Sequence, residues 1–168
     1  MKTRPDKYYK DIYKVNYKLL KKEGIKVVLF DLDNTLIDKT ELILSVKTKK
    51  LLDSLKKDFY VAIVSNSVKP LQAYYLKKDY EIDIVTLSFK PLGFGFNRLK
   101  KLKNYKPNEI CMIGDQIFTD VFGANRRGYT SILVDYISLG ISNISILNNY
   151  VASRAFKKYN LKRGQYYD

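Results

Sequence analysis

Two aspartates, Asp31 and Asp33, stand two positions apart in a polar turn that directly follows an apolar run, residues 25–30. Carboxylates at this spacing can face one site, where one attacks a substrate and the other donates and later accepts a proton. The same stretch also fits an ordinary turn in which Asp and Asn side chains bind local backbone groups. The pair alone leaves both interpretations open.

Polar residues follow two further apolar runs. Ser65 and Asn66 come after residues 59–64 and offer a hydroxyl and backbone N–H groups that suit a phosphate oxygen, or else an ordinary helix cap. Lys90 precedes a proline, so it is either a cation held on a stiff turn or a solvated surface lysine.

A second pair of acids follows the run that ends at residue 113. Gly114 allows close backbone approach, and Asp115 offers a carboxylate of the kind that Mg²⁺ prefers. Asp120 is a further acid in the same turn.

The composition restricts the chemistry that these groups can perform. The 168 residues contain no His and one Cys, which excludes imidazole catalysis, an intramolecular disulfide and a cysteine-rich zinc site. Any catalysis must use carboxylates, Lys or hydroxyls, with or without a hard metal ion. Cys111, inside an apolar run, is expected to be a buried apolar residue. The net charge of +14 favours anionic partners: nucleic acid, acidic lipid surfaces or phosphorylated substrates.

Alternating apolar and amphipathic stretches must position these residues. We expect five strands, at 25–30, 59–64, 82–87, 110–113 and 129–134. We expect helices at 45–57, 71–78, 96–103 and 119–127. This pattern predicts an α/β fold whose mainly parallel sheet has helices on both faces. The carboxyl ends of such strands share one edge, which would gather four polar residues: Asp31, Ser65, Lys90 and Asp115.

The two ends of the chain lie outside this core of about residues 25–134, and we expect residues 1–168 to form a single domain. Residues 1–24 are basic and aromatic, so their apolar side either packs on the sheet or contacts a membrane surface. After residue 135, a loop leads to a basic segment that fits a helix between 144 and 159.

No apolar run approaches the ~20 residues of a membrane span, and no signal peptide is visible. We therefore expect a cytoplasmic protein, with a peripheral position at the inner membrane surface also compatible.

Four motifs in order, DLDNT at 31–35, VSN at 64–66, KP at 90–91 and GDQIFTD at 114–120, resemble those of the haloacid dehalogenase (HAD) superfamily of phosphotransferases. The resemblance implies a Rossmann-like domain and an aspartyl-phosphate mechanism. Asp31 would be the nucleophile and a magnesium ligand, and Asp33 the general acid and base and a ligand through its carbonyl. Asp115 would complete the magnesium site, with Asp120 supporting it from behind. The substrate phosphate would be held by Thr35, Ser65, Asn66 and Lys90.

The number of residues between the motifs indicates what size of substrate the site can accept. Only 23 residues separate Thr35 from Phe59, and 23 separate Asn66 from Lys90, which leaves room for one helix each and for no cap domain. An open site suits a substrate whose bulk lies outside it. The chain is most similar to the capless YqeG-like branch, which includes phosphatidylglycerophosphatases, although that branch often carries basic residues where this chain has Phe89 and Phe94.

The sequence therefore predicts a Mg²⁺-dependent phosphomonoesterase acting on phosphatidylglycerophosphate in phospholipid biosynthesis. It would reach an anionic membrane surface through residues 1–24 and the basic tail at 154–163. One alternative is a HAD phosphatase of a phosphoprotein, nucleotide or small metabolite. Another is a basic nucleic-acid-binding protein on an inactive HAD scaffold, which the intact set of acids and the lack of an RNA-binding motif disfavour.

Overall fold

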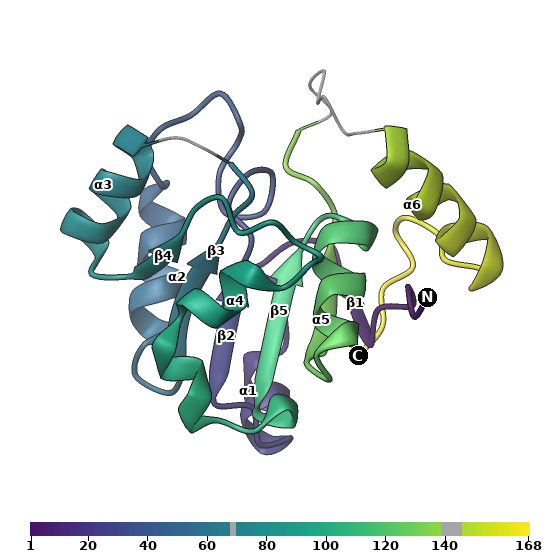
Figure 1. The fold of residues 1–168 in the computed structure, drawn as a ribbon, viewed down its shortest axis with the longest axis horizontal. Coiled ribbons are helices and arrows are strands. Elements are labelled where there is room, and N and C mark those ends of the chain that lie inside the picture. Colours follow the sequence, from purple (N-terminus) through teal and green to yellow (C-terminus); the bar gives the residue numbers. More distant parts are fainter. Residues whose placement is uncertain (68–69, 139–145) are drawn as a thin grey trace.

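The computed structural model describes residues 1–67, 70–138 and 146–168, and these build a six-stranded sheet in the order β1-β6-β5-β2-β3-β4 (Figure 1). Every neighbouring pair of strands in it is parallel. The strands are β1 (Lys7–Tyr9), β2 (Val27–Phe30), β3 (Tyr60–Val64), β4 (Asp83–Val85), β5 (Ile110–Gly114) and β6 (Thr130–Val134). The predicted Rossmann-like α/β fold with a parallel sheet is confirmed, with one strand more than the five expected.

The additional strand, β1, comes from the basic aromatic segment at the N-terminus. It pairs with β6, where Lys7 lies opposite Ile132. The apolar side of this segment packs into the protein, since Tyr8, Tyr9 and Ile12 are buried. Three residues without alternating polarity give no strand pattern, so the sequence did not indicate β1.

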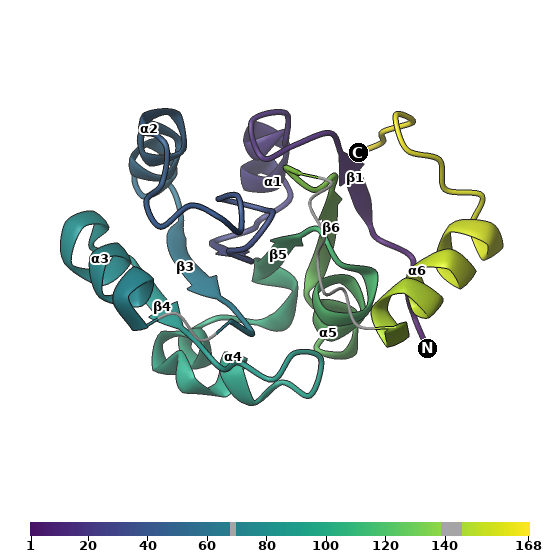
Figure 2. The same ribbon diagram turned by 90° about the horizontal axis from the view of Figure 1, so that it is seen from above.

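Helices cover both faces of the sheet (Figure 2). On one face lie α1 (Tyr17–Lys22), α2 (Val46–Leu55) and α3 (Pro70–Tyr80), and on the other α4 (Phe94–Arg98) and α5 (Phe122–Arg126). Two short segments, η1 (Lys100–Asn104) and η2 (Pro107–Glu109), are 3₁₀-helices. A third, η3 (Ile117–Val121), is a π-helix. The helices expected at 96–103 and 119–127 are thus each divided into two short pieces.

Successive residues of a strand point to opposite faces, and both faces here are covered. Val28 and Phe30 of β2 join the core under α1, α2 and α3, whereas Val27 and Leu29 join the core under α4 and α5. Burial on both sides explains why the strands read as continuous apolar runs. Ser45 caps α2, because its side chain accepts a hydrogen bond from the N–H of Thr48.

The C-terminal part of the chain packs beside β1 and β6. Helix α6 (Ile146–Lys158) buries Val151 and Ala155 in a cluster that includes Tyr8. The backbone of Tyr167 exchanges two hydrogen bonds of 2.8 Å with that of Tyr8, so both termini lie near this edge (Figure 1). The first residues of the helix expected at 144–159, and most of the loop before it, lie outside the described residues. No described helix has the length and apolar character needed to cross a membrane.

Candidate active site

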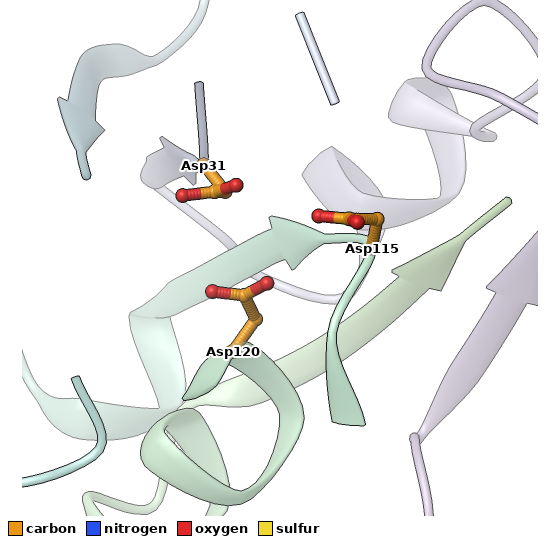
Figure 3. A group of neighbouring side chains, drawn as sticks. All are labelled: Asp31, Asp115 and Asp120. Atoms are coloured by element: carbon orange, nitrogen blue, oxygen red, sulfur yellow. The ribbon is translucent and has the colours of Figure 1, made fainter. Parts of the chain in front are cut away.

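Three carboxylates converge where β2 and β5 end (Figure 3). One oxygen each of Asp31, Asp115 and Asp120 can be chosen so that all three lie within 4.8 Å of one another. The ammonium of Lys90 joins this group: its Nζ lies 2.6 Å from Asp31 Oδ1 and 2.7 Å from Asp120 Oδ1. Only 1% of the Lys90 side chain is exposed. The sheet topology therefore brings together residues from three separate sequence motifs.

Pairing of the central strands positions the first two acids. Phe30 of β2 lies opposite Ile113 of β5, and the N–H of Asp31 donates to the Ile113 carbonyl at 2.8 Å. Asp31 and Asp115 are therefore the first residues beyond two adjacent parallel strands, at the edge where ligands bind in folds of this kind.

A glycine and a wide helical turn bring Asp120 into the group. A Cβ atom at Gly114 would collide with the Asp120 carboxyl, so only glycine leaves room for this approach. The Asp120 Oδ2 atom accepts a hydrogen bond of 3.1 Å from the N–H of Gln116 across the first turn of η3. Asp120 thus lies beside Asp31 and Asp115 and contacts Lys90 directly.

The electrostatics of this group favour a divalent cation. Burial raises the pKa of Asp31 to about 7, against the opposing effect of the neighbouring Lys90 ammonium. The pKa of Asp115 is also raised, by burial first and then by Asp31 and Asp120. Burial lowers the pKa of Lys90, but Asp120 and Asp31 outweigh it and raise the pKa overall. Three carboxylates thus face one ammonium, and the excess negative charge on hard oxygen donors fits an ion such as Mg²⁺.

The other residues of the DLDNT motif lie around this cluster. The Thr35 hydroxyl donates to Asp115 Oδ1 at 3.3 Å, which links the two motifs. Asp33 is half-buried in a turn closed by the N–H of Asn34, which donates to the Ile37 carbonyl at 2.7 Å. The Asp33 carboxylate does not belong to the group of three, although its charge adds to those that raise the pKa of Asp31.

Ser65 and Asn66 follow β3 on the other side of β2. Ser65 is buried, and its Oγ accepts a hydrogen bond of 3.0 Å from the N–H of Ser67. The amide of Asn66 holds the loop that carries Lys90: its Oδ1 accepts from the Lys90 N–H at 2.8 Å, and its Nδ2 donates to the Lys90 carbonyl at 3.1 Å. The Ser88 hydroxyl also donates to Asn66 Oδ1, at 2.6 Å. This clamp could not be predicted from the sequence, because its partners lie more than 20 residues apart.

The fold has close counterparts among solved structures. A HAD family enzyme from Bacteroides thetaiotaomicron, crystallised as an aspartate-to-alanine mutant with magnesium and inorganic phosphate, matches with a TM-score of 0.53. The match covers 73% of this chain and 100% of that chain at 12% identity, which establishes the fold alone. The likeness shows that the chain has the fold of this HAD family enzyme.

Sequence relatives define the branch. A family model described as "Mitochondrial PGP phosphatase" matches residues 2–138, and the chain belongs to this family. The probable phosphatase YqeG of Bacillus subtilis (strain 168) is 30% identical over 151 residues, which cover 89% of this chain and 87% of that protein. Phosphatidylglycerophosphate phosphatase 1, chloroplastic/mitochondrial, of Arabidopsis thaliana is 27% identical over 138 residues, 77% of this chain and 40% of that protein. The predicted capless YqeG-like branch is confirmed.

Proposed function

We propose that this phosphatase is a Mg²⁺-dependent phosphomonoesterase that forms an aspartyl-phosphate on Asp31, and that its substrate is phosphatidylglycerophosphate. One observation carries the proposal: a buried ammonium, that of Lys90, contacts both Asp31 and Asp120, with Asp115 beside them. A carboxylate nucleophile needs positive charge around an incoming phosphate, and this arrangement supplies it.

The reaction would proceed in two displacements. A carboxylate oxygen of Asp31 forms a bond to phosphorus while the bond from phosphorus to the alkoxide oxygen breaks, and Asp33 gives its proton to that oxygen. Asp33 then takes a proton from a water molecule, whose oxygen attacks phosphorus and displaces the Asp31 carboxylate. Inorganic phosphate leaves, and both aspartates return to their initial states.

The metal and phosphate sites follow from the same residues. Mg²⁺, held by Asp31, Asp115 and the carbonyl of Asp33, would neutralise charge on the transferring phosphoryl group. Asp120 would keep Lys90 in place. Phosphate oxygens would be bound by the side chains or backbone of Thr35, Ser65, Asn66 and Lys90. Of these, Ser65 already accepts a hydrogen bond through Oγ, which leaves its hydroxyl proton for the substrate.

The substrate assignment is supported by the names of the matching family model and the Arabidopsis relative. It is also supported by the short connections between β2 and β3 and between β3 and β4, whose described residues contain one helix each, α2 and α3. A site without a cap accommodates a head-group phosphate whose lipid chains remain outside. The enzyme would then act at a membrane surface, on its cytoplasmic side.

The test is phosphate release from a panel of substrates with Mg²⁺ and with EDTA. Phosphatidylglycerophosphate in mixed micelles should be hydrolysed faster than soluble phosphoesters, and Asp31→Asn should hydrolyse none. A preference for a nucleotide, phosphopeptide or sugar phosphate would leave the mechanism standing and replace the substrate. Salt-sensitive RNA binding without hydrolysis of any phosphomonoester would contradict the whole proposal.

A further inference from the structure

Large apolar side chains exposed to solvent gather at the edge of the sheet where the active site lies. Six of them lie in the loop from β2 to α2, in the loop from β4 to α4 and at the first residue of α4: Leu42, Ile43, Leu87, Phe89, Leu92 and Phe94. In Figure 1 the loop from β2 to α2 rises to the top of the molecule and the loop from β4 to α4 crosses the view lower down, above α4; Figure 2 shows the molecule from above. Among the described residues, the connections at the opposite edge, 23–26, 56–59, 81–82, 99–109 and 127–129, carry no exposed large apolar side chain.

The backbone conformation of the loop from β4 to α4 keeps its apolar side chains exposed. Leu87 and Phe89 have positive φ angles of 48° and 51°, which bulky residues rarely adopt. The Asn66 amide, bound to the backbone of Lys90, helps to hold the loop there. As a result the Lys90 side chain points inward to Asp31, while Phe89 is 58% exposed. Strain that persists in a native structure commonly marks a functional segment, and here its product is an outward-facing aromatic ring next to the phosphate site.

Resting on the proposed function, we propose that these six residues form a membrane-docking rim, which enters the interfacial layer of an anionic bilayer and brings Asp31 to the head group of a lipid phosphate. A phosphate that reaches Asp31 from a bilayer must approach through this edge. Leu92 and Phe94, 63% and 61% exposed, would then leave water. Removing such large apolar side chains from water is favourable, and the gain grows with the apolar area buried.

The charge of the whole molecule supports an anionic lipid surface as the partner, because its net charge of +14 draws it toward such a surface. At the edge of the rim, the exposed Lys10 after β1 and Lys47 in the first turn of α2 can contact lipid phosphates directly. The loops at this edge also carry acids, namely Asp11, Asp38 and Glu41. The rim also replaces residues 1–24 as the apolar contact surface, since Tyr8, Tyr9 and Ile12 are buried.

The experiment measures co-sedimentation of the full chain with vesicles of phosphatidylcholine and phosphatidylglycerol at low salt. Phe89→Asn with Phe94→Ser should lower the partition onto vesicles by at least about tenfold, because two rings no longer enter the interface. Asn suits the positive φ at position 89. If this pair fails to fold, Leu42→Ser with Ile43→Ser tests the other loop of the rim independently. Binding by either folded pair equal to that of the wild type would overturn the proposal, as would a wild type that ignores these vesicles.

A matched pair of charge variants separates the two edges. Lys10→Gln with Lys47→Gln should weaken vesicle binding about tenfold or more, whereas Lys100→Gln with Lys103→Gln removes the same charge from the opposite edge and should change it less than about twofold. Equal losses of vesicle binding in the two pairs would show that the charge of the protein attracts it to vesicles in no fixed orientation, and this result would overturn the proposal. Release of a dimer to monomers by the Phe89 and Phe94 changes would instead assign the rim to a second copy of the chain and also overturn the proposal.

Hydrolysis distinguishes this inference from the function on which it rests. The Phe89 and Phe94 pair should hydrolyse the water-soluble p-nitrophenyl phosphate at close to the wild-type rate, yet lose most of its activity on phosphatidylglycerophosphate in vesicles. A wild type that binds vesicles through the rim but hydrolyses no phosphomonoester would contradict the proposed function and retain the docking surface. Equal losses on both substrates would show that the loop acts on catalysis and would overturn docking as its role.

Discussion

At the scale of single residues, the site consists of one buried ammonium and three carboxylates that have few other partners. Among the described residues, Lys90 is the one cation in contact with Asp31 and Asp120, and the Thr35 hydroxyl donates a hydrogen bond to the Asp115 carboxylate. Removing any one of these groups leaves the others unbalanced, since an unpaired buried charge is strongly unfavourable. Variants of these residues must therefore keep the size and shape of the side chain and change only its chemistry.

Asp31→Asn keeps the size of the side chain and removes the nucleophile. We expect turnover to fall to the background rate, with the fold retained, because an amide oxygen cannot form the acyl-phosphate. Phosphate release and circular dichroism together test this expectation. A folded variant with activity comparable to the wild type would exclude Asp31 as the nucleophile.

Asp33→Asn should lower kcat by ~10²–10⁴-fold on an alkyl phosphate, since the leaving alkoxide loses its proton donor. The first displacement on p-nitrophenyl phosphate, followed as the release of p-nitrophenol in a single turnover, should be slowed much less, because this leaving group departs without a proton. Comparing this first step on the two substrates separates a protonation role from a structural one, since the later attack of water needs Asp33 with either substrate. Equal losses in the first step on both would assign Asp33 to the turn that it forms rather than to protonation of the leaving group.

At the scale of elements, the loop from β4 to α4 depends on a residue of a different loop. Asn66→Ala removes three hydrogen bonds, two to the Lys90 backbone and one to Ser88, so Lys90 should lose its fixed position. We expect a fall in kcat/KM of about tenfold to a hundredfold, in the range of one to three kcal/mol for such bonds. Ser67→Ala, whose side chain has no part in this clamp, serves as the control and should retain activity.

The reactivity of the Cys111 thiol reports whether the central strand β5 is buried. Cys111 is fully buried in β5, as expected from the sequence, and burial raises the pKa of its thiol. A thiol-specific reagent at pH 8 should therefore react with the native protein far more slowly than with the unfolded protein, because native Cys111 is both inaccessible and protonated. Rapid reaction of one thiol per native molecule would contradict the packing described here.

The sequence predicted the elements whose signal is local. Residues 25–30, 59–64 and 110–113 are apolar runs long enough to mark buried strands, and Ser45 marks the start of α2. The motifs placed Asp31 and Asp115 at strand ends on one edge of the sheet, and the structure shows that these two strands are neighbours. The approach of Asp120 to Lys90 and the Asn66 clamp could not be predicted, because both depend on distances set by the three-dimensional packing of loops.

At the scale of the whole molecule, a divalent cation should stabilise the fold as well as support activity. Binding to the native acid cluster shifts the unfolding equilibrium by mass action, so Mg²⁺ should raise the melting temperature and EDTA should reverse it. Asp115→Asn should lose most of this Mg²⁺ effect, whereas Asp58→Asn, an exposed surface acid, should keep it. A melting temperature that does not respond to Mg²⁺ in the wild type would remove the cluster as a metal site.

The sheet can be completed only when distant parts of the chain meet. Asp6, just before β1, bonds to Ser131 in β6, and these residues are 125 positions apart. During synthesis at ~5–20 residues per second, β1 therefore leaves the ribosome on the order of ten seconds before its partner does. Pairings of this length slow folding, and an unpaired strand with Tyr8 and Tyr9 exposed can bind other chains meanwhile. Closure of β1 onto β6, which also seats Tyr167 and the C-terminal tail, is thus expected to be the last step of folding.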